Sequence, residues 1–208
     1  MDKEEIRSRL AAGCASDEAL ASPGGAAASP LAARGAPGVP GAPPGPAVPA
    51  AVLIALVNSP RGPEIILTQR TADMRNHPAQ ISLPGGKIEP GDSGPAAAAL
   101  REAWEEVGLP PGRVDILGCL PLHRTVSDYC VHPFVGWVEP PVSLVPDERE
   151  VADVFLVPLQ FVIDPLNHLR ESLWRDGQES RYYVLPYPGR RIWGATAAIL
   201  VSLAQALS

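Results

Sequence analysis

Length, composition and charge limit the possible classes of protein. The chain has 208 residues and a formal net charge of −6 at pH 7, enough length for one domain with a substantial core plus an appendage. An acidic chain without a lysine- and arginine-rich run is not expected to bind nucleic acid. No apolar run approaches the roughly 20 residues of a transmembrane helix, and the acidic start is atypical of a signal peptide, so we expect no membrane association and a cytoplasmic location.

The three cysteines stand at positions 14, 119 and 130. Their scattered spacings match no zinc-binding pattern and form no even set for disulfide bonds. Cys119 lies in an apolar run, where we expect a buried free thiol. A reducing cytoplasm fits this interpretation.

The chain starts with an appendage. Residues 1–20 are expected to form a short helix or tail, and residues 21–47 a flexible linker, because 24 of the 30 residues from 21 to 50 are Ala, Pro or Gly. Such a composition cannot bury enough apolar surface to fold. Removing residues 1–45 is therefore expected to leave stability and activity nearly unchanged.

Residues 48–208 have the pattern of a packed α/β domain. An alanine-rich run from Pro95 predicts a helix that ends at Gly108, and apolar spacing predicts a closing helix over Ile192–Leu207. Short aliphatic runs bounded by turn residues predict strands at Ala50–Val57, Glu64–Gln69, Val114–Leu120, Val131–Val138, Val154–Val157 and Tyr182–Leu185. Mixed strands interrupted by two helices favour an α/β/α sandwich with a mixed sheet.

The helix predicted from Pro95 carries three carboxylates on one face. Glu102, Glu105 and Glu106 are spaced i, i+3 and i+4, so in a helix they repel one another. A hard divalent cation such as Mg²⁺ turns this cost into a binding site, because it prefers carboxylate oxygens and substrate phosphates. The preceding Gly85-Gly86 pair lets backbone approach a ligand closely. The alternative is a solvated acidic helix face.

The stretch from Gly86 to Leu109 resembles the signature of the Nudix hydrolases, G-x5-E-x7-R-E-U-x-E-E-x-G-U, in which U is aliphatic. Gly86 matches the first Gly, and residues 101–109 follow in order, with Ala103 at the first aliphatic position. Two departures are Asp92 in place of Glu and eight residues instead of seven before Arg101. The resemblance implies a Nudix domain over residues 48–208, with the α/β/α fold and hydrolysis of a nucleoside diphosphate linked to another moiety.

A segment just upstream narrows the resemblance. Residues 66–86 are similar to the element L-L-T-x-R-S-x-x-L-x-x-H-x-G-Q-x-x-F-P-G-G of the coenzyme A pyrophosphatases, with Ala79 in place of Gly and Leu83 in place of Phe. Residues 187–197 resemble the closing segment of that group. The resemblance implies cleavage of coenzyme A (CoA) or acyl-CoA to 3′,5′-ADP and 4′-phosphopantetheine or its acyl form.

The resemblance also implies roles for individual residues. Glu102, Glu105, Glu106 and the Gly86 carbonyl are expected to bind Mg²⁺ or Mn²⁺, and Arg101 to orient a carboxylate. Asp92 either ties the loop to the helix or accepts a local hydrogen bond in the loop. The expected catalytic residues are Glu105, Arg101 and Glu150. Glu150 lies in a segment similar to the subfamily's E-V-x-x-V-F-x-V-P-L, although it also fits an exposed charged turn.

Several residues are candidates for binding the substrate. Arg70 and His77 precede the Gly85-Gly86 loop and are expected to meet a second phosphate group, in particular the 3′-phosphate of CoA, although His77 also fits a structural loop histidine. Asp128 and Tyr129 lie in a polar loop between two strands, where binding residues are common. Trp193 either stacks on a base or packs in the core.

Two other functions stay open at this point. One is a Nudix hydrolase of ADP-ribose or another nucleoside diphosphate derivative, and the other is a Nudix-like binding module without catalysis. Such a module is expected to lose the metal carboxylates, and all three are present. The expected partner is a small nucleoside diphosphate, with CoA as the first choice, and the expected assembly is a monomer or homodimer.

Overall fold

The computed structural model describes residues 1–11, 47–72, 79–175 and 178–208. Residues 21–46 of the expected linker lie outside the described ranges, and so does His77.

The centre of the main sheet is a parallel pair of long strands. β1 (Val48–Val57) runs beside β7 (Tyr129–Val138) in a continuous register from Val48↔Tyr129 to Val57↔Val138. On the other side of β7, β5 (Val114–Cys119) and β6 (His123–Arg124) pair antiparallel with it. Valine, isoleucine and leucine dominate β1, as expected for a strand covered on both faces.

The sheet divides along β1. Its first half pairs with the short β4 (Gly85–Lys87), whereas its last two residues pair with β2 (Glu64–Arg70). β2 pairs in turn with β8 (Val151–Pro158) along most of its length and with β3 (Ile81–Ser82) near its end. This division brings the chain from the end of β2 back to the Gly85-Gly86 loop beside β1.

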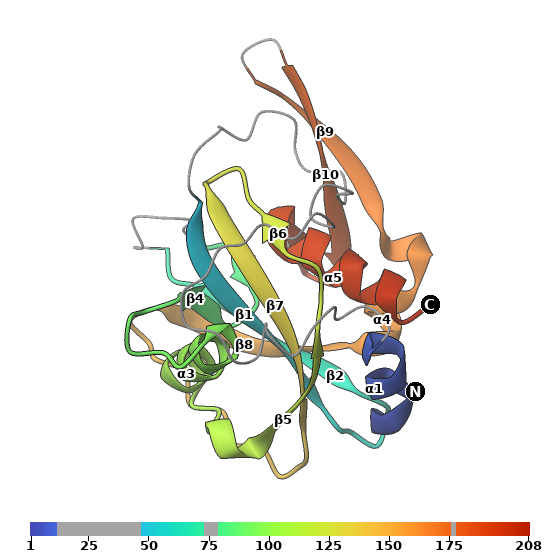
Figure 1. The fold of residues 1–208 in the computed structure, drawn as a ribbon. Helices are drawn as coiled ribbons and strands as arrows, with labels where there is room; N and C mark the ends of the chain where they lie inside the picture. The colour runs from blue at the N-terminus through green and yellow to red at the C-terminus, as the bar shows by residue number, and fades with distance from the viewer. Residues whose placement is uncertain (12–46, 73–78, 176–177) are drawn as a thin grey trace.

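Helices cover both faces of the main sheet. α3 (Pro95–Val107) lies on one face, and α1 (Lys3–Ala11), α4 (Leu159–Ile163) and α5 (Gly194–Ala206) lie on the other (Figure 1). Short 3₁₀ turns, η2 (Pro111–Arg113) and η3 (Pro165–Asn167), follow α3 and α4. The expected α/β/α sandwich with a mixed sheet is confirmed.

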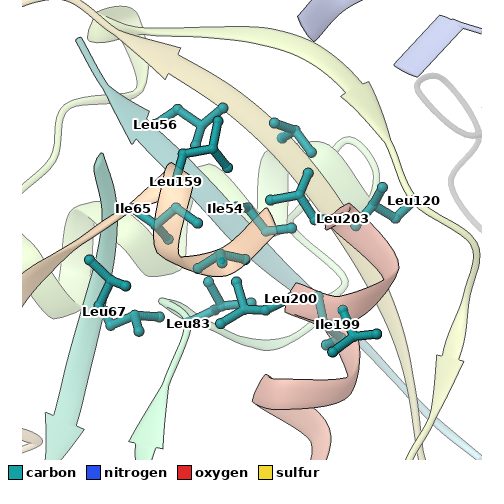
Figure 2. Close-up of a cluster of buried hydrophobic side chains, with 14 of the residues drawn as sticks. Ile54, Leu56, Ile65, Leu67, Leu83, Leu120, Leu159, Ile199, Leu200 and Leu203 are labelled. Atoms are coloured by element: carbon teal, nitrogen blue, oxygen red, sulfur yellow. The ribbon is translucent and has the colours of Figure 1, made fainter. Parts of the chain in front are cut away.

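Each face of the sheet has its own apolar core. Alanines of α3 pack against Leu53 and Phe134 in the smaller cluster, and these small side chains let the helix approach the strands closely. The larger cluster joins α1, α4 and α5 to the opposite face. Part of it is shown in Figure 2, with these labelled side chains: Ile54, Leu56, Ile65, Leu67, Leu83, Leu120, Leu159, Ile199, Leu200 and Leu203.

A second sheet lies at the C-terminal end of the chain. It consists of β9 (Leu169–Arg175), β10 (Gln178–Tyr187) and β11 (Arg190–Trp193), in the order β11-β10-β9, and the β9–β10 hairpin extends beyond the main body (Figure 1). The closing helix starts at Gly194 instead of Ile192, because Arg190–Trp193 pairs with β10 after a turn in which Gly189 has φ +73°. The sequence pattern did not predict the strands β3, β4, β6, β9 and β11.

The N-terminal helix packs on the domain. Ile6 and Leu10 are 0% and 1% exposed and belong to the larger core cluster. Asp115 of β5 accepts from Lys3 Nζ at 2.9 Å and from Arg7 Nη2 at 2.7 Å. This packing argues against the expectation that residues 1–45 can be removed with little effect on stability, because removal would expose part of the core.

Two further findings concern cysteine and membrane association. Cys119 is disulfide-bonded, so the expected free thiol at this position is wrong, whereas Cys130 carries a free thiol. Within the described ranges, no helix has the length and apolar character needed to cross a membrane.

Candidate active site

The Gly85-Gly86 loop and helix α3 meet at backbone distance. The Gly85 N–H donates to Glu106 Oε2 at 3.3 Å. A Cβ atom at Gly86 would lie 2.4 Å from Glu102 Oε1, so only glycine lets the Glu102 carboxylate rest against the β4 backbone. The two glycines therefore bring backbone directly to two of the three carboxylates.

The sequence of α3 sets the direction of these carboxylates. Pro95 occupies the first turn, and Gly108 ends the helix in the left-handed region at φ 68°. Ala99 and Ala103 are buried against the sheet, which turns Glu106 inward and leaves Glu105 half-exposed at the opening of the site. The i, i+3, i+4 spacing thus places the Glu106 carboxylate in the interior and the Glu105 carboxylate at the surface.

Arg101 connects four oxygen-bearing groups. Its Nε and Nη2 donate to Asp92 Oδ1 and Oδ2 at 2.9 and 3.1 Å, and Nη2 also donates to the Lys87 carbonyl at 3.0 Å. Its Nη1 donates to Glu102 Oε1 at 3.0 Å and to Glu105 Oε2 at 2.9 Å. Arg101 therefore positions the two carboxylates and fixes the loop to the helix.

Asp92 has both of the roles considered from the sequence. It accepts from Arg101, and its Oδ2 also accepts from the Glu89 N–H at 2.8 Å. The hydrogen bond from Arg101 holds the pKa of Asp92 below its ordinary value of 3.8. The shorter Asp side chain thus still makes the two-point contact with Arg101.

Glu106 is a carboxylate kept in a dry environment. Its side chain is 5% exposed, and this burial raises its pKa to about 8, against the opposing effect of the Arg70 charge. Burial also raises the pKa of Glu102 above its ordinary value. Both shifts arise because water no longer solvates the charged form.

Arg70 reaches the carboxylates from the end of β2. Its Nη1 lies 3.7 Å from Glu106 Oε1, and its Nη2 lies 4.0 Å from Glu150 Oε2. Its Nε is buried and has no hydrogen-bond partner among the described residues. Glu150 is held nearby, because the Thr71 N–H donates to its carbonyl at 3.0 Å. Arg70 and Glu150 thus belong to the same site as α3, while one buried N–H of Arg70 is left for another partner.

The donor set fits a hard divalent cation. Glu102, Glu105 and Glu106 offer only oxygen, and no N–H of Arg70 is within hydrogen-bond distance of the buried Glu106 Oε1. In the arrangement seen, Arg101 takes one oxygen each of Glu102 and Glu105, and within the described ranges no three His, Cys, Asp or Glu side chains converge closely enough to form a finished metal site. A cation would therefore have to compete with Arg101 for Glu102 and Glu105.

Other candidates are not joined to this cluster. Asp128 lies in the β6–β7 turn with φ 61° and accepts from Arg124 Nη2 at 3.2 Å, while Tyr129 packs against the larger core. Neither has a hydrogen bond or ion pair to the carboxylates of α3 among the described contacts. The role of the Lys87 carbonyl as an acceptor was not predicted, because a pattern of side-chain types carries no information on backbone acceptors.

Comparison with known proteins identifies the family. The family model described as NUDIX domain matches residues 47–176. Among curated proteins, the chain is 40% identical over 155 residues to the Uncharacterized Nudix hydrolase NudL of Photorhabdus laumondii, covering 74% of this chain and 82% of the relative. The protein of the same name from Escherichia coli K12 is 39% identical over 154 residues, covering 74% and 80%.

Two examples represent the similar chains among the solved structures. A C. elegans Ap4A hydrolase in a binary complex has a TM-score of 0.47 at 20% identity, covering 53% of this chain and 80% of that one. RenU, a Nudix hydrolase from M. smegmatis, has a TM-score of 0.48 at 24% identity, covering 56% and 74%.

The family model and the curated relatives show that the chain belongs to the Nudix hydrolases, enzymes that act on diphosphate bonds and generally use divalent metal ions.

Proposed function

We propose that this chain hydrolyses the diphosphate of CoA and acyl-CoA, releasing 3′,5′-ADP and 4′-phosphopantetheine or its acyl form. The observation that carries this proposal is the contact between Arg70 and Glu106. Arg70 belongs to the element that resembles the CoA pyrophosphatases, and Glu106 belongs to the Nudix helix. Two stretches of sequence similarity therefore meet in one site.

Four groups are proposed to hold Mg²⁺ or Mn²⁺. These are the carboxylates of Glu102, Glu105 and Glu106 and the carbonyl of Gly86. When bound, such an ion neutralises phosphate oxygens and lowers the pKa of a coordinated water. Arg101 acts through these ligands, because its hydrogen bonds hold Glu102 and Glu105 in place.

Two exposed carboxylates are able to accept a proton from the attacking water. Glu105 and Glu150 have side chains that are 54% and 52% exposed, whereas Glu106 is buried. Glu150 also lies beside Arg70, so a base at this position would be close to a phosphate bound by Arg70. We assign the general base to Glu150, with Glu105 as the competing residue.

Arg70 is proposed to bind the diphosphate. Its guanidinium group stands beside the buried Glu106, and its Nε has no partner in the described structure. A phosphate oxygen can satisfy that N–H with a charge-assisted hydrogen bond. This position next to the carboxylates favours contact with the bond that is broken over contact with the distant 3′-phosphate.

The experiment is product analysis with a substrate panel. The panel contains CoA, an acyl-CoA, ADP-ribose and dinucleoside polyphosphates, each incubated with the purified full chain and Mg²⁺ and then separated by chromatography with mass detection. We expect the highest kcat/KM for CoA or acyl-CoA, with 3′,5′-ADP as a product. A higher kcat/KM for ADP-ribose or a dinucleoside polyphosphate would replace the CoA assignment, and no hydrolysis of any substrate would favour a binding module.

A further inference from the structure

A pocket of about 360 Å³ lies beside the end of β2, outside the carboxylate cluster. It is formed where β2 and β3 meet the turn between β10 and β11. The lining is polar and aromatic, with Gln69, Gln80, Arg190, Arg191 and Trp193 as its main side chains. None of these residues has a role in the proposed chemistry.

Trp193 lines this pocket. The side chain is 38% exposed, so the alternative of a core tryptophan, weighed from the sequence, does not hold. Tyr182 meets the ring edge-on, with the centroids 5.8 Å apart, and the Arg191 guanidinium carbon lies 5.5 Å from the ring centroid. A fixed, partly exposed aromatic ring is a stacking surface for a heterocyclic base.

Two arginines at the pocket differ in how firmly they are held. Arg190 pairs with Asp153, donates to Gln69 Oε1 at 3.0 Å and lies 3.7 Å above the Phe155 ring, so it is a wall of the pocket. Arg191 uses Nη2 alone in its described hydrogen bonds, to Glu171 at 2.5 Å and to the Tyr182 hydroxyl at 3.2 Å. Its Nε and Nη1 donors have no described partner, so they are able to bind an anion.

The first turn of α5 adds to the positive potential at this place. Trp193 is the N-cap residue of this 13-residue helix and supplies no side-chain cap. The first N–H groups of a helix lack partners within the helix and attract negative charge. Arg191 and the helix start therefore flank the exposed indole ring.

The pocket and the carboxylate cluster share one strand as a wall. Gln69 lines the pocket, and its neighbour Arg70 reaches Glu106 on the other face of β2, because successive side chains of a strand alternate. The Arg70 N–H donates to the Gln80 carbonyl at 2.9 Å, which joins the two walls at the edge of the sheet. A ligand that occupies both places must extend over this edge, as a diphosphate linked to a nucleoside can.

We propose that this pocket binds the nucleotide end of the substrate, with the purine on Trp193 and its ribose phosphate on Arg191 and the start of α5. This inference rests on the proposed function in so far as the nucleotide is the 3′-phosphorylated ADP portion of CoA. In this arrangement Arg191 binds the 3′-phosphate, whereas Arg70 binds the diphosphate.

The test is equilibrium binding of 3′,5′-ADP to the full chain, measured by titration calorimetry without metal. Trp193→Ala is expected to weaken binding about ten- to a hundredfold, in line with the loss of one base stack. Arg191→Gln is expected to weaken 3′,5′-ADP about tenfold or more while changing the affinity for 5′-AMP less. Trp174→Ala and Arg181→Gln are matched controls, because these side chains are exposed on the β9–β10 hairpin away from the pocket and should have no effect.

A second variant guards against misfolding. Trp193→Phe keeps a ring and is expected to keep most of the affinity, and thermal unfolding of each variant shows whether it is folded. In folded variants, equal binding by wild type and Trp193→Ala would overturn the inference. This outcome differs from failure of the proposed function, because nucleotide binding is measured without CoA hydrolysis. A wild type that binds 3′,5′-ADP through Trp193 but does not hydrolyse CoA would reject only the CoA assignment.

Discussion

Arg101 donates to both carboxylate oxygens of Asp92, at 2.9 and 3.1 Å, and so joins the loop that follows Gly86 to helix α3. The Asp92 side chain is 5% exposed, so the pair is shielded from solvent. The same guanidinium group holds Glu102 and Glu105. Two-point contact of this kind fixes direction as well as distance.

This pair predicts a dependence of stability on pH. Asp92→Asn should lower the free energy of unfolding by about 1.5–3 kcal/mol near neutral pH, because a hydrogen-bonded buried charge is lost. The pKa of Asp92 is lowered in the folded state, so its contribution is present above the ordinary value of 3.8 and is lost as the pH falls through the folded value. Urea unfolding of both proteins from pH 8 to pH 3 measures the difference, which should be constant down to about pH 4 and then narrow. A difference in the free energy of unfolding that stays constant down to pH 3 would contradict a stabilising pair between ionised Asp92 and Arg101.

The glycine loop predicts a specific effect on metal affinity. Gly86→Ala should displace the Glu102 carboxylate, because the added Cβ would lie 2.4 Å from its Oε1. We expect the Mg²⁺ concentration for half-maximal activity to rise about ten- to a hundredfold with the fold intact. Gly91→Ala is the matched control, because a Cβ there meets nothing within 4 Å. Identical Mg²⁺ curves for wild type and Gly86→Ala would remove Glu102 from the site.

The position of Arg70 predicts that its removal lowers activity on CoA and on dephospho-CoA equally. If Arg70 binds the diphosphate beside Glu106, Arg70→Ala should lower kcat/KM about ten- to a hundredfold on CoA and on dephospho-CoA alike. Arg61→Ala, which removes an exposed arginine elsewhere, should change neither value. Steady-state kinetics on both substrates measures these values of kcat/KM. A loss of kcat/KM for CoA alone would instead mean that Arg70 binds the 3′-phosphate.

The N-terminal helix predicts an effect on stability alone. Leu10→Ala should lower the free energy of unfolding by about 2–5 kcal/mol, because Leu10 is buried in the larger core. Ser8→Ala, on the exposed side of α1, should have little effect. Chemical denaturation compares the two variants, and activity well below the unfolding temperature should match wild type for both. A Leu10→Ala protein as stable as wild type would mean that α1 does not pack on the domain in solution.

Local patterns predicted the parts of the site that are local in the chain. The helix with Glu102, Glu105 and Glu106 follows from a spacing within one turn and from alanines that favour helix. The long strands β1 and β7 follow from continuous aliphatic runs. Two roles stayed open for Asp92, and its pairing with Arg101 was not predicted, because it depends on how the loop folds back onto the helix.

The remaining features depend on contacts that are distant in the chain. The strands β4 and β11 have three and four residues and form only because a partner strand lies beside them, so their own sequence carries little signal. The packing of α1 depends on distant parts of the chain, because Lys3 and Arg7 pair with Asp115 of β5 and Arg9 donates to the Leu207 carbonyl. The position of Trp193 at a pocket could not be predicted from the sequence, because it depends on the pairing of β11 with β10.

The most direct test of the central claim is the hydrolysis of CoA by wild type and by Glu106→Gln at saturating Mg²⁺, with both products quantified. We predict that wild type releases equal amounts of 3′,5′-ADP and 4′-phosphopantetheine. The variant should lose more than about a hundredfold in rate, because removing a metal ligand is expected to cost at least as much as removing a residue that supports one. It should stay folded, since an amide at a buried position carries no charge that needs solvation. A folded Glu106→Gln enzyme that keeps most of its Mg²⁺-dependent activity would contradict the account.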